Sequence, residues 1–150
     1  MEKQIIDDKI KELFISSRVI ALVGASKKKE KDSNIVMKFL QKSGYKVIPV
    51  NPTCINDTIN GERVYGSLLD IKEKVDIVDV FRPSEEALDI AIKTKEIGAH
   101  VLWLQLNIEN DKAKEIAIKN KIYYIANRCT KIEFEKLFLN INPTFPGLNS

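Results

Sequence analysis

The sequence predicts a Rossmann-like α/β fold, a doubly wound parallel sheet of about five strands with helices on both faces. Segments typical of strands and of helices alternate about five times along the 150 residues. The strand segments are continuous apolar runs, such as VIALV at 19–23, which are typical of strands buried on both faces. The length fits one ordinary domain, so we expect a single domain over 1–150.

The first elements follow from apolar spacing. A short leading helix is expected over 4–16, because apolar residues recur there at helical spacing. These residues are Ile6, Ile10, Leu13 and Phe14. After the first strand, a second helix is expected over 34–43, with Asp32 or Ser33 as its N-cap and an apolar face toward the sheet.

The remaining elements continue the alternation. The second strand is YKVIPVNP, which stops at Asn51 and Pro52. The polar stretch 53–63 is expected to form turns, and VYGSL at 64–68 a short strand or a turn. Further strands are expected at 76–81, 100–106 and 122–127, with helices at 84–97, 110–119 and 132–139 and a loose tail at 141–150.

The strand ends carry the functional signal. In parallel sheets of this class, ligands bind outside the carboxyl ends of the strands. The residues that follow the predicted strands are small, polar or basic: Gly24, Ala25 and Ser26; Asn51 and Pro52; Phe81, Arg82 and Pro83; Gln105; Arg128 and Cys129. A purely structural sheet has no need for arginines and amides at this edge, so we expect a binding site there.

The first loop favours a phosphate or pyrophosphate. It runs from Gly24, which permits a tight turn, into the start of a helix, where backbone N–H groups and the helix dipole attract anions. Ser26 and Ser33 add hydroxyl donors, and the lysines between them, including Lys31, add positive charge.

Two common phosphate ligands fit poorly. The loop lacks the Gly-Lys-Ser/Thr ending of a P-loop, which disfavours ATP hydrolysis. It also lacks the further glycines of a dinucleotide fingerprint, and Asn51 stands where an NAD site carries an acid for the ribose. The chain has one histidine and two distant cysteines, so no metal site is expected.

Several patterns together resemble a known family. VGAS, GYKVIPVNP, VDVF, VLWLQL and RCTKIE are similar to segments of the small single-domain CoA-binding proteins of the YccU-like group. These proteins are related to the CoA-binding domain of the succinyl-CoA synthetase α subunit. The resemblance covers roughly residues 17–138 and is specific in combination, because any one of these patterns alone is a weak signal.

The resemblance implies a Rossmann-like fold that binds coenzyme A at the strand ends. By position, Gly24, Ala25 and Ser26 would meet the pyrophosphate, with Lys31 and Ser33 beside it, and Asn51 and Pro52 would border the adenosine. Phe81, Arg82, Pro83, Trp103 and Gln105 would line the path of the cofactor, and Arg128 and Cys129 would lie near the pantetheine end.

The chain departs from the family pattern at four positions. Lys29 and Asp32 stand where many members have proline, Lys31 where they have arginine, and Thr53 where some have a lysine. The lysine at position 31 keeps the charge but loses the bidentate fork of arginine, so a weaker or differently posed phosphate clamp is expected. A contact to the 3′-phosphate of CoA is missing if Thr53 replaces its lysine.

We therefore expect a CoA or acyl-CoA binding protein that acts as carrier, sensor or regulatory module and has no catalytic residues of its own. The alternative is an enzyme, either a nucleotide-dependent oxidoreductase or a CoA-thiol redox protein that uses Cys129, whose pKa Arg128 would lower. A buried, inert Cys129 and a core role for Trp103 are the simpler interpretations of those residues. A third possibility is a degenerate Rossmann domain that acts only through protein contacts.

The composition of the chain disfavours several classes of partner. The net charge is +3 with lysines and acids interspersed, which does not favour nucleic acid. No apolar run approaches the ~18 residues of a membrane span, and the start lacks a signal-peptide core, so neither a membrane nor secretion is expected and the location should be cytoplasmic. A homo-oligomer remains open, because the leading helix offers a packing surface.

Overall fold

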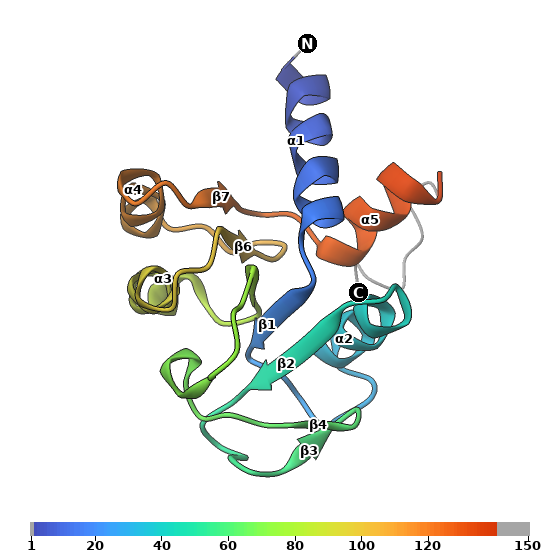
Figure 1. The fold of residues 1–150 in the computed structure, drawn as a ribbon, viewed down its shortest axis with the longest axis vertical. Coiled ribbons are helices and arrows are strands. Elements are labelled where there is room, and N and C mark those ends of the chain that lie inside the picture. The colour runs from blue at the N-terminus through green and yellow to red at the C-terminus, as the bar shows by residue number, and fades with distance from the viewer. Residues whose placement is uncertain (1, 141–150) are drawn as a thin grey trace.

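The fold is built on a five-stranded parallel sheet (Figure 1), in a computed structural model that describes residues 2–140. The strands are β1 (Val19–Val23), β2 (Lys46–Val50), β5 (Ile77–Val80), β6 (Val101–Leu104) and β7 (Tyr123–Ile125). Their order in the sheet is β2-β1-β5-β6-β7. The order reverses direction between β1 and β5, which creates the topological switch point where ligands bind in this fold class. The predicted Rossmann-like class is confirmed.

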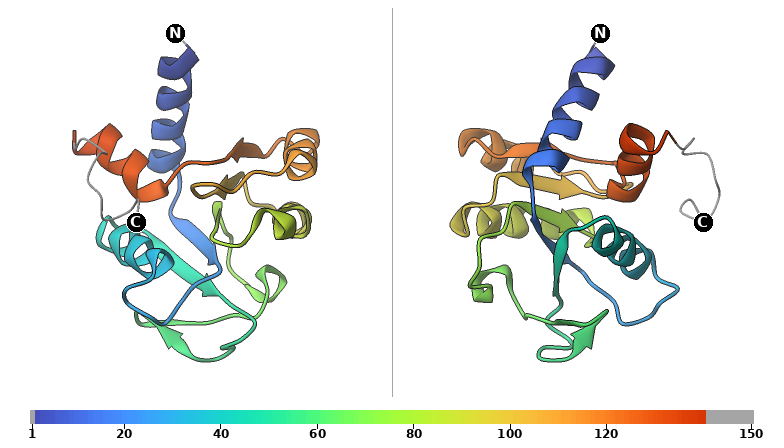
Figure 2. Two further views of the ribbon diagram at one scale, coloured as in Figure 1. Left: turned by 180° about the vertical axis from the view of Figure 1, so that it is seen from behind. Right: turned by 45° about the vertical axis from the view of Figure 1, so that its right-hand side comes forward.

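Helices cover both faces of the sheet, as Figures 1 and 2 show. One face carries α1 (Glu2–Ser16), α2 (Asp32–Lys42) and α5 (Thr130–Phe138), and the other carries α3 (Ala87–Glu96) and α4 (Asp111–Lys119). The alternation of side chains along each strand explains why both faces are apolar. In β1, Ile20 and Leu22 enter the first core, whereas Ala21 and Val23 enter the second.

The strand β6 shows how the sheet holds its covering helices. Trp103 is fully buried, and its ring lies 5.4 Å from that of Phe14 on α1. Its indole N–H donates to the carbonyl of Arg128 at 2.8 Å, just before α5. A single side chain of the central sheet therefore fixes both the leading helix and the last helix.

Three details differ from the sequence prediction. Helix α2 begins at Asp32, and Lys31 occupies the N-cap position without a side-chain capping bond, so neither Asp32 nor Ser33 is the N-cap. The stretch expected to form turns holds a hairpin of β3 (Thr58–Ile59) and β4 (Glu62–Arg63). Strand β7 is shorter than the predicted 122–127 and lies at one edge of the sheet, where Tyr123 is 46% exposed.

Two short 3-10 helices complete the described chain, η1 (Leu68–Asp70) and η2 (Ser84–Glu86). The predicted helix over 84–97 is therefore η2 followed by α3. Within residues 2–140, none of the helices has the length and apolar character needed to cross a membrane. The expected loose tail, 141–150, lies outside the described residues.

Candidate functional site

The turn at Gly24 lies at the switch point between β1 and its two neighbours. Its backbone has φ +91°, and its N–H donates to the carbonyl of Val50 at the end of β2 at 3.0 Å. On the other side, a Cβ at this position would lie 2.9 Å from the carbonyl oxygen of Phe81 and 2.9 Å from Cδ of Arg82. Glycine is required here both by the backbone conformation and by the close approach of the chain after β5.

Two amide side chains hold the loop that follows. Asn51 donates from Nδ2 to the carbonyl of Ala25 at 2.8 Å, and Asn34 donates from Nδ2 to the carbonyl of Ser26 at 2.7 Å. The hydroxyl oxygen of Ser26 accepts from the N–H of Lys28 at 3.1 Å, a bond that does not use its own hydrogen. The loop is therefore pinned through two carbonyl oxygens, while the Ser26 hydroxyl keeps a donor for a ligand.

The loop ends at a helix start that can accept an anion. Lys31 at the N-cap of α2 forms no side-chain capping bond, so the first N–H groups of the helix keep the open donors of an uncapped helix start. Lys31 itself is exposed, whereas Ser33 is buried within the first turn. A phosphate at this end would be held mainly by backbone N–H groups and exposed charge, and Ser33 would contribute through the packing of the turn.

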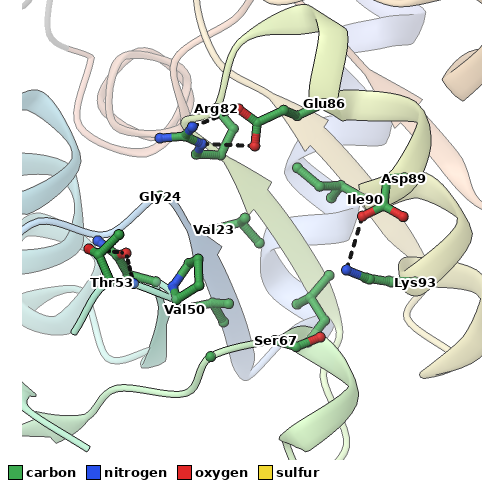
Figure 3. Close-up of a pocket in the computed structure, with 14 residues that line it drawn as sticks. Val23, Gly24, Val50, Thr53, Ser67, Arg82, Glu86, Asp89, Ile90 and Lys93 are labelled. Carbon is green, nitrogen blue, oxygen red and sulfur yellow. Dashed lines mark hydrogen bonds and ion pairs between the residues drawn. The ribbon is translucent and has the colours of Figure 1, made fainter. Parts of the chain in front are cut away.

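A small pocket of about 190 Å³ opens beside this turn, on the side of α3 (Figure 3). Four predicted residues line it: Gly24, Asn51, Pro52 and Arg82. The remaining lining residues were not predicted to belong to the site: Val23, Val50, Thr53, Gly66, Ser67, Leu68, Glu86, Asp89, Ile90 and Lys93. The volume is below the ~300–1,000 Å³ of pockets that enclose a drug-sized ligand. It therefore fits one moiety of a larger ligand.

The charges at the rim of this pocket are paired (Figure 3). Arg82 donates from Nε and Nη2 to the two carboxylate oxygens of Glu86 at 3.1 and 2.6 Å, and Lys93 lies 2.9 Å from Asp89. The hydrogen bond with Arg82 lowers the pKa of Glu86, and the same bond raises the pKa of Arg82. A phosphate that binds Arg82 must therefore compete with the Glu86 carboxylate.

The predicted residues from the last two strands lie away from the pocket. Trp103 is fully buried, and Gln105 donates from Nε2 to Asp79 at 2.5 Å and to Thr130 at 2.9 Å inside the protein. Arg128 pairs with Glu133 at 2.9 Å. These side chains join α5 to the sheet.

The two residues that flank Arg82 also differ in placement. Phe81 is partly buried and packs on the core beneath α1, α2 and α5, whereas Pro83 is exposed at the N-cap of η2. Of this predicted group, Arg82 alone lines the pocket.

The structure favours the simpler interpretation of Cys129, a buried and inert thiol, over its activation by Arg128. The thiol is 4% exposed, and burial raises its pKa to about 11. Arg128 does not counteract this effect, because its guanidinium is directed to Glu133. A thiol with this pKa is almost entirely protonated at neutral pH, and the thiolate is the reactive form.

Cys129 is therefore expected to react slowly with thiol reagents in the native protein. At pH 8, a pKa of about 11 makes the reaction about a hundredfold slower than that of an ordinary thiol, before burial is considered. Mass spectrometry after iodoacetamide labelling should find native modification at the partly exposed Cys54 and not at Cys129. Labelling in denaturant, where both thiols should react, is the control. Native labelling of Cys129 at the rate of free glutathione would contradict the assignment.

The loop and pocket residues that were not predicted from the sequence had weak signals. Asn34 is an unusual residue for the first turn of a buried helix face, and this was the available sign that its side chain serves the neighbouring loop. Ser67 and Leu68 reach the pocket because Tyr65 forms a parallel bridge with Val50. Lys93 has no signal in the sequence, since its place depends on how α3 packs.

The fold and the geometry define a class of protein: a Rossmann-like domain with a candidate ligand site at the switch point and a tight glycine turn after the first strand. Residues 18–135 match the CoA binding domain family, and the chain belongs to this family. The resemblance inferred from the sequence is thereby confirmed.

Relatives of known sequence agree with this assignment. The chain is 37% identical over 123 residues to the uncharacterized protein YneT of Bacillus subtilis, a match covering 82% of this chain and 90% of that protein. It is 30% identical over 135 residues to an ADP-forming acetate–CoA ligase of Methanocaldococcus jannaschii, covering 84% of this chain and 18% of the ligase. A solved structure of a hypothetical protein from Pyrococcus horikoshii has a TM-score of 0.84 and 40% identity, covering 87% of this chain and 91% of that chain.

Proposed function

We propose that this protein binds CoA or an acyl-CoA at the carboxyl edge of its sheet and acts as a carrier, sensor or regulatory module without catalytic residues of its own. The observation that carries the proposal is the Gly24 turn, wedged between the ends of β2 and β5 and followed by a helix start without a side-chain cap. Membership of the CoA binding domain family supports CoA as the ligand. The pocket beside the turn would take one part of the cofactor, and the rest would follow the loop surface.

The choice of CoA over NAD rests on Asn51. An NAD site needs an acid at this strand end to accept from the ribose hydroxyls. Here the amide is already committed, since it donates to Ala25 and its oxygen accepts from the N–H and hydroxyl of Thr53 at 2.9 and 2.7 Å. The position thus organises the loop and supplies no carboxylate. The thiol-redox alternative loses support because Cys129 is buried and protonated.

Calorimetry tests the proposal directly. CoA, dephospho-CoA and NAD are titrated at one fixed salt concentration, and CoA is expected to bind tightest. The Arg82→Ala variant should bind CoA about tenfold more weakly, because a charge-assisted contact is lost. Arg18→Ala is the matched control, since Arg18 is an exposed arginine at the opposite edge of the sheet. Tighter binding of NAD, or no binding of any ligand, would overturn the proposal.

Removing the carboxylate that competes for Arg82 should have the opposite effect. The Glu86→Gln variant frees the guanidinium and removes a negative charge from the rim of the pocket. We expect CoA affinity to rise about threefold, within the range of an exposed ion pair. Glu85→Gln, on the adjacent exposed acid, controls for net charge. An unchanged affinity in Glu86→Gln, together with a loss in Arg82→Ala, would show that the arginine acts only through packing.

A further inference from the structure

A second concave surface lies on the opposite side of the loop from the proposed CoA pocket. It runs along the outer side of α2, which lies between α5 and the β3–β4 hairpin in Figures 1 and 2. The groove has a volume of about 650 Å³ and shares no lining residue with the pocket beside Gly24. We call it the α2 groove.

The charged residues that line the α2 groove are all lysines. They are Lys29, Lys38, Lys42 and Lys131. Lys131 pairs with Glu135 at 3.1 Å, but within residues 2–140 the other three form no salt bridge with a carboxylate. In the first loop, by contrast, Lys27 pairs with Asp57 at 2.8 Å. The groove therefore concentrates positive charge that the described part of the chain does not neutralise.

The walls of the groove are fixed by contacts between distant elements. Asn60 in the hairpin turn donates from Nδ2 to Oδ1 of Asn34 at 3.3 Å, and its carbonyl accepts from Gln41 at 3.0 Å. On the other side, the Lys131 ammonium lies 5.2 Å from the centre of the Phe39 ring. These contacts join the hairpin, α2 and α5 around a floor formed by Ile35 and Phe39. The shape is thus held in place before any partner arrives.

The spacing of the lysines indicates the shape of a partner. Lys38 and Lys42 are one helical turn apart, or about 6 Å along the helix axis. In an extended peptide, side chains on one face repeat every two residues, or about 6.6 Å. Carboxylates at alternate positions of an extended segment would match the lysines, and an apolar residue at a further position on the same face would cover Ile35 and Phe39. A double-stranded nucleic acid would present phosphates to the lysines and leave this apolar floor uncovered.

We propose that the α2 groove binds an extended acidic segment of another protein, with carboxylates at alternate residues and an apolar residue toward Phe39. This interaction is separate from CoA binding, because the groove and the CoA pocket are lined by different residues. Lys29, however, belongs to both the groove and the loop after β1. A segment bound in the groove would therefore also contact the loop that is proposed to bind the pyrophosphate.

Fluorescence anisotropy with a labelled synthetic peptide tests the proposal. The probe is a 12-residue peptide whose alternate positions carry glutamate, glutamate and leucine in repeating order, with serine between them, so that one face presents both carboxylates and apolar residues. Its control replaces every glutamate by glutamine. We expect the acidic peptide to bind, the glutamine peptide not to bind, and added salt to weaken binding. The double variant Lys38→Glu/Lys42→Glu should lower the affinity about tenfold.

A matched pair on α4 controls for charge and helix position. Lys112→Glu/Lys119→Glu changes the net charge by the same amount. Lys119 lies in the last turn of α4, and Lys42 lies in the last turn of α2. This pair should change the affinity less than twofold, and circular dichroism confirms that both variants are folded. Equal losses in both pairs would overturn the proposal, and so would tighter binding of a single-stranded 12-nucleotide DNA than of the peptide. The Lys38→Glu/Lys42→Glu variant is also titrated with CoA, and its CoA affinity should be unchanged. A failure of peptide binding can then be told apart from a failure of CoA binding.

Discussion

Replacing Gly24 by alanine is expected to lower the free energy of unfolding by about 3 kcal/mol, because two separate costs add. The first is the backbone conformation, φ +91°, which a residue with a Cβ adopts at a cost of about 1 kcal/mol. The second is steric. The new Cβ would lie 2.9 Å from the carbonyl oxygen of Phe81 and must displace the chain after β5.

The surroundings of Gly24 cannot easily yield. The N–H of Phe81 donates to Val23 at 2.8 Å, and the N–H of Gly24 donates to Val50 at 3.0 Å, so hydrogen bonds hold both sides of the turn. A shift would also move Arg82, whose Cδ lies 2.9 Å from the Cβ position. We therefore expect weaker CoA binding as well as lower stability.

Gly98→Ala is the matched control for this prediction. Gly98 has φ +73°, but a Cβ there would meet no atom within 4 Å. Chemical denaturation of the two variants separates the costs, because Gly98→Ala should lose about 1 kcal/mol from the backbone alone. Equal losses for the two variants would show that the close approach at Gly24 has no energetic consequence.

The second large effect concerns pH and the buried carboxyl of Asp79. This side chain is fully buried on β5, where Gln105 and Thr130 donate hydrogen bonds to its two oxygens. Burial raises its pKa from the ordinary 3.8 to about 7, and the two hydrogen bonds oppose the shift without cancelling it. Because Thr130 is the first residue of α5, the network joins β5, the end of β6 and the last helix.

The sign of the pH effect follows from proton uptake. Between pH 4 and pH 7, the folded protein holds a proton on Asp79 that the unfolded chain has released. The contribution of this group to stability is therefore complete below pH 4 and is lost as the pH rises to 7. The difference between 3.8 and about 7 corresponds to a contribution on the order of 4 kcal/mol.

Asp79→Asn tests this prediction, because asparagine keeps the shape of the side chain and cannot ionise. Urea denaturation at pH 5 and pH 8 gives the stability of the variant relative to the wild type at each pH. That difference should shift in favour of the variant by several kcal/mol at pH 8. The Asp70→Asn variant, which removes an exposed carboxylate, shows how much the stability changes when a carboxylate that is not buried is lost. A difference that is the same at both pH values would mean that Asp79 does not change its protonation state in this range.

Much of the fold could be predicted because its elements carry local signals. A strand buried on both faces must be apolar at every position, so VIALV and VLWL are recognisable without their neighbours. Gly24 follows such a strand directly and precedes an amphipathic helix, and this order locates the loop that is expected to bind a phosphate. The hairpin of β3 and β4 was missed because strands of two residues are too short for a periodic pattern.

The sequence by itself determined the α/β class, the edge of the sheet at which the candidate site lies, and Gly24, Asn51 and Arg82 as residues that meet there. These follow from apolar runs and from the rule that parallel strands end at a common edge. Only the tertiary structure decided that Lys93 and Ser67 complete the pocket, and that Trp103 and Cys129 lie in the interior.

The physical reason is that burial and pairing depend on which elements lie side by side. The same neighbouring arginine that could activate a thiol instead binds Glu133. The packing of α5 buries Cys129, and this burial disfavours the thiolate more than the nearby backbone N–H groups and Lys131 favour it. In the same way, Asp79 looks like any aspartate in the sequence, and its raised pKa arises when β5, β6 and α5 enclose it.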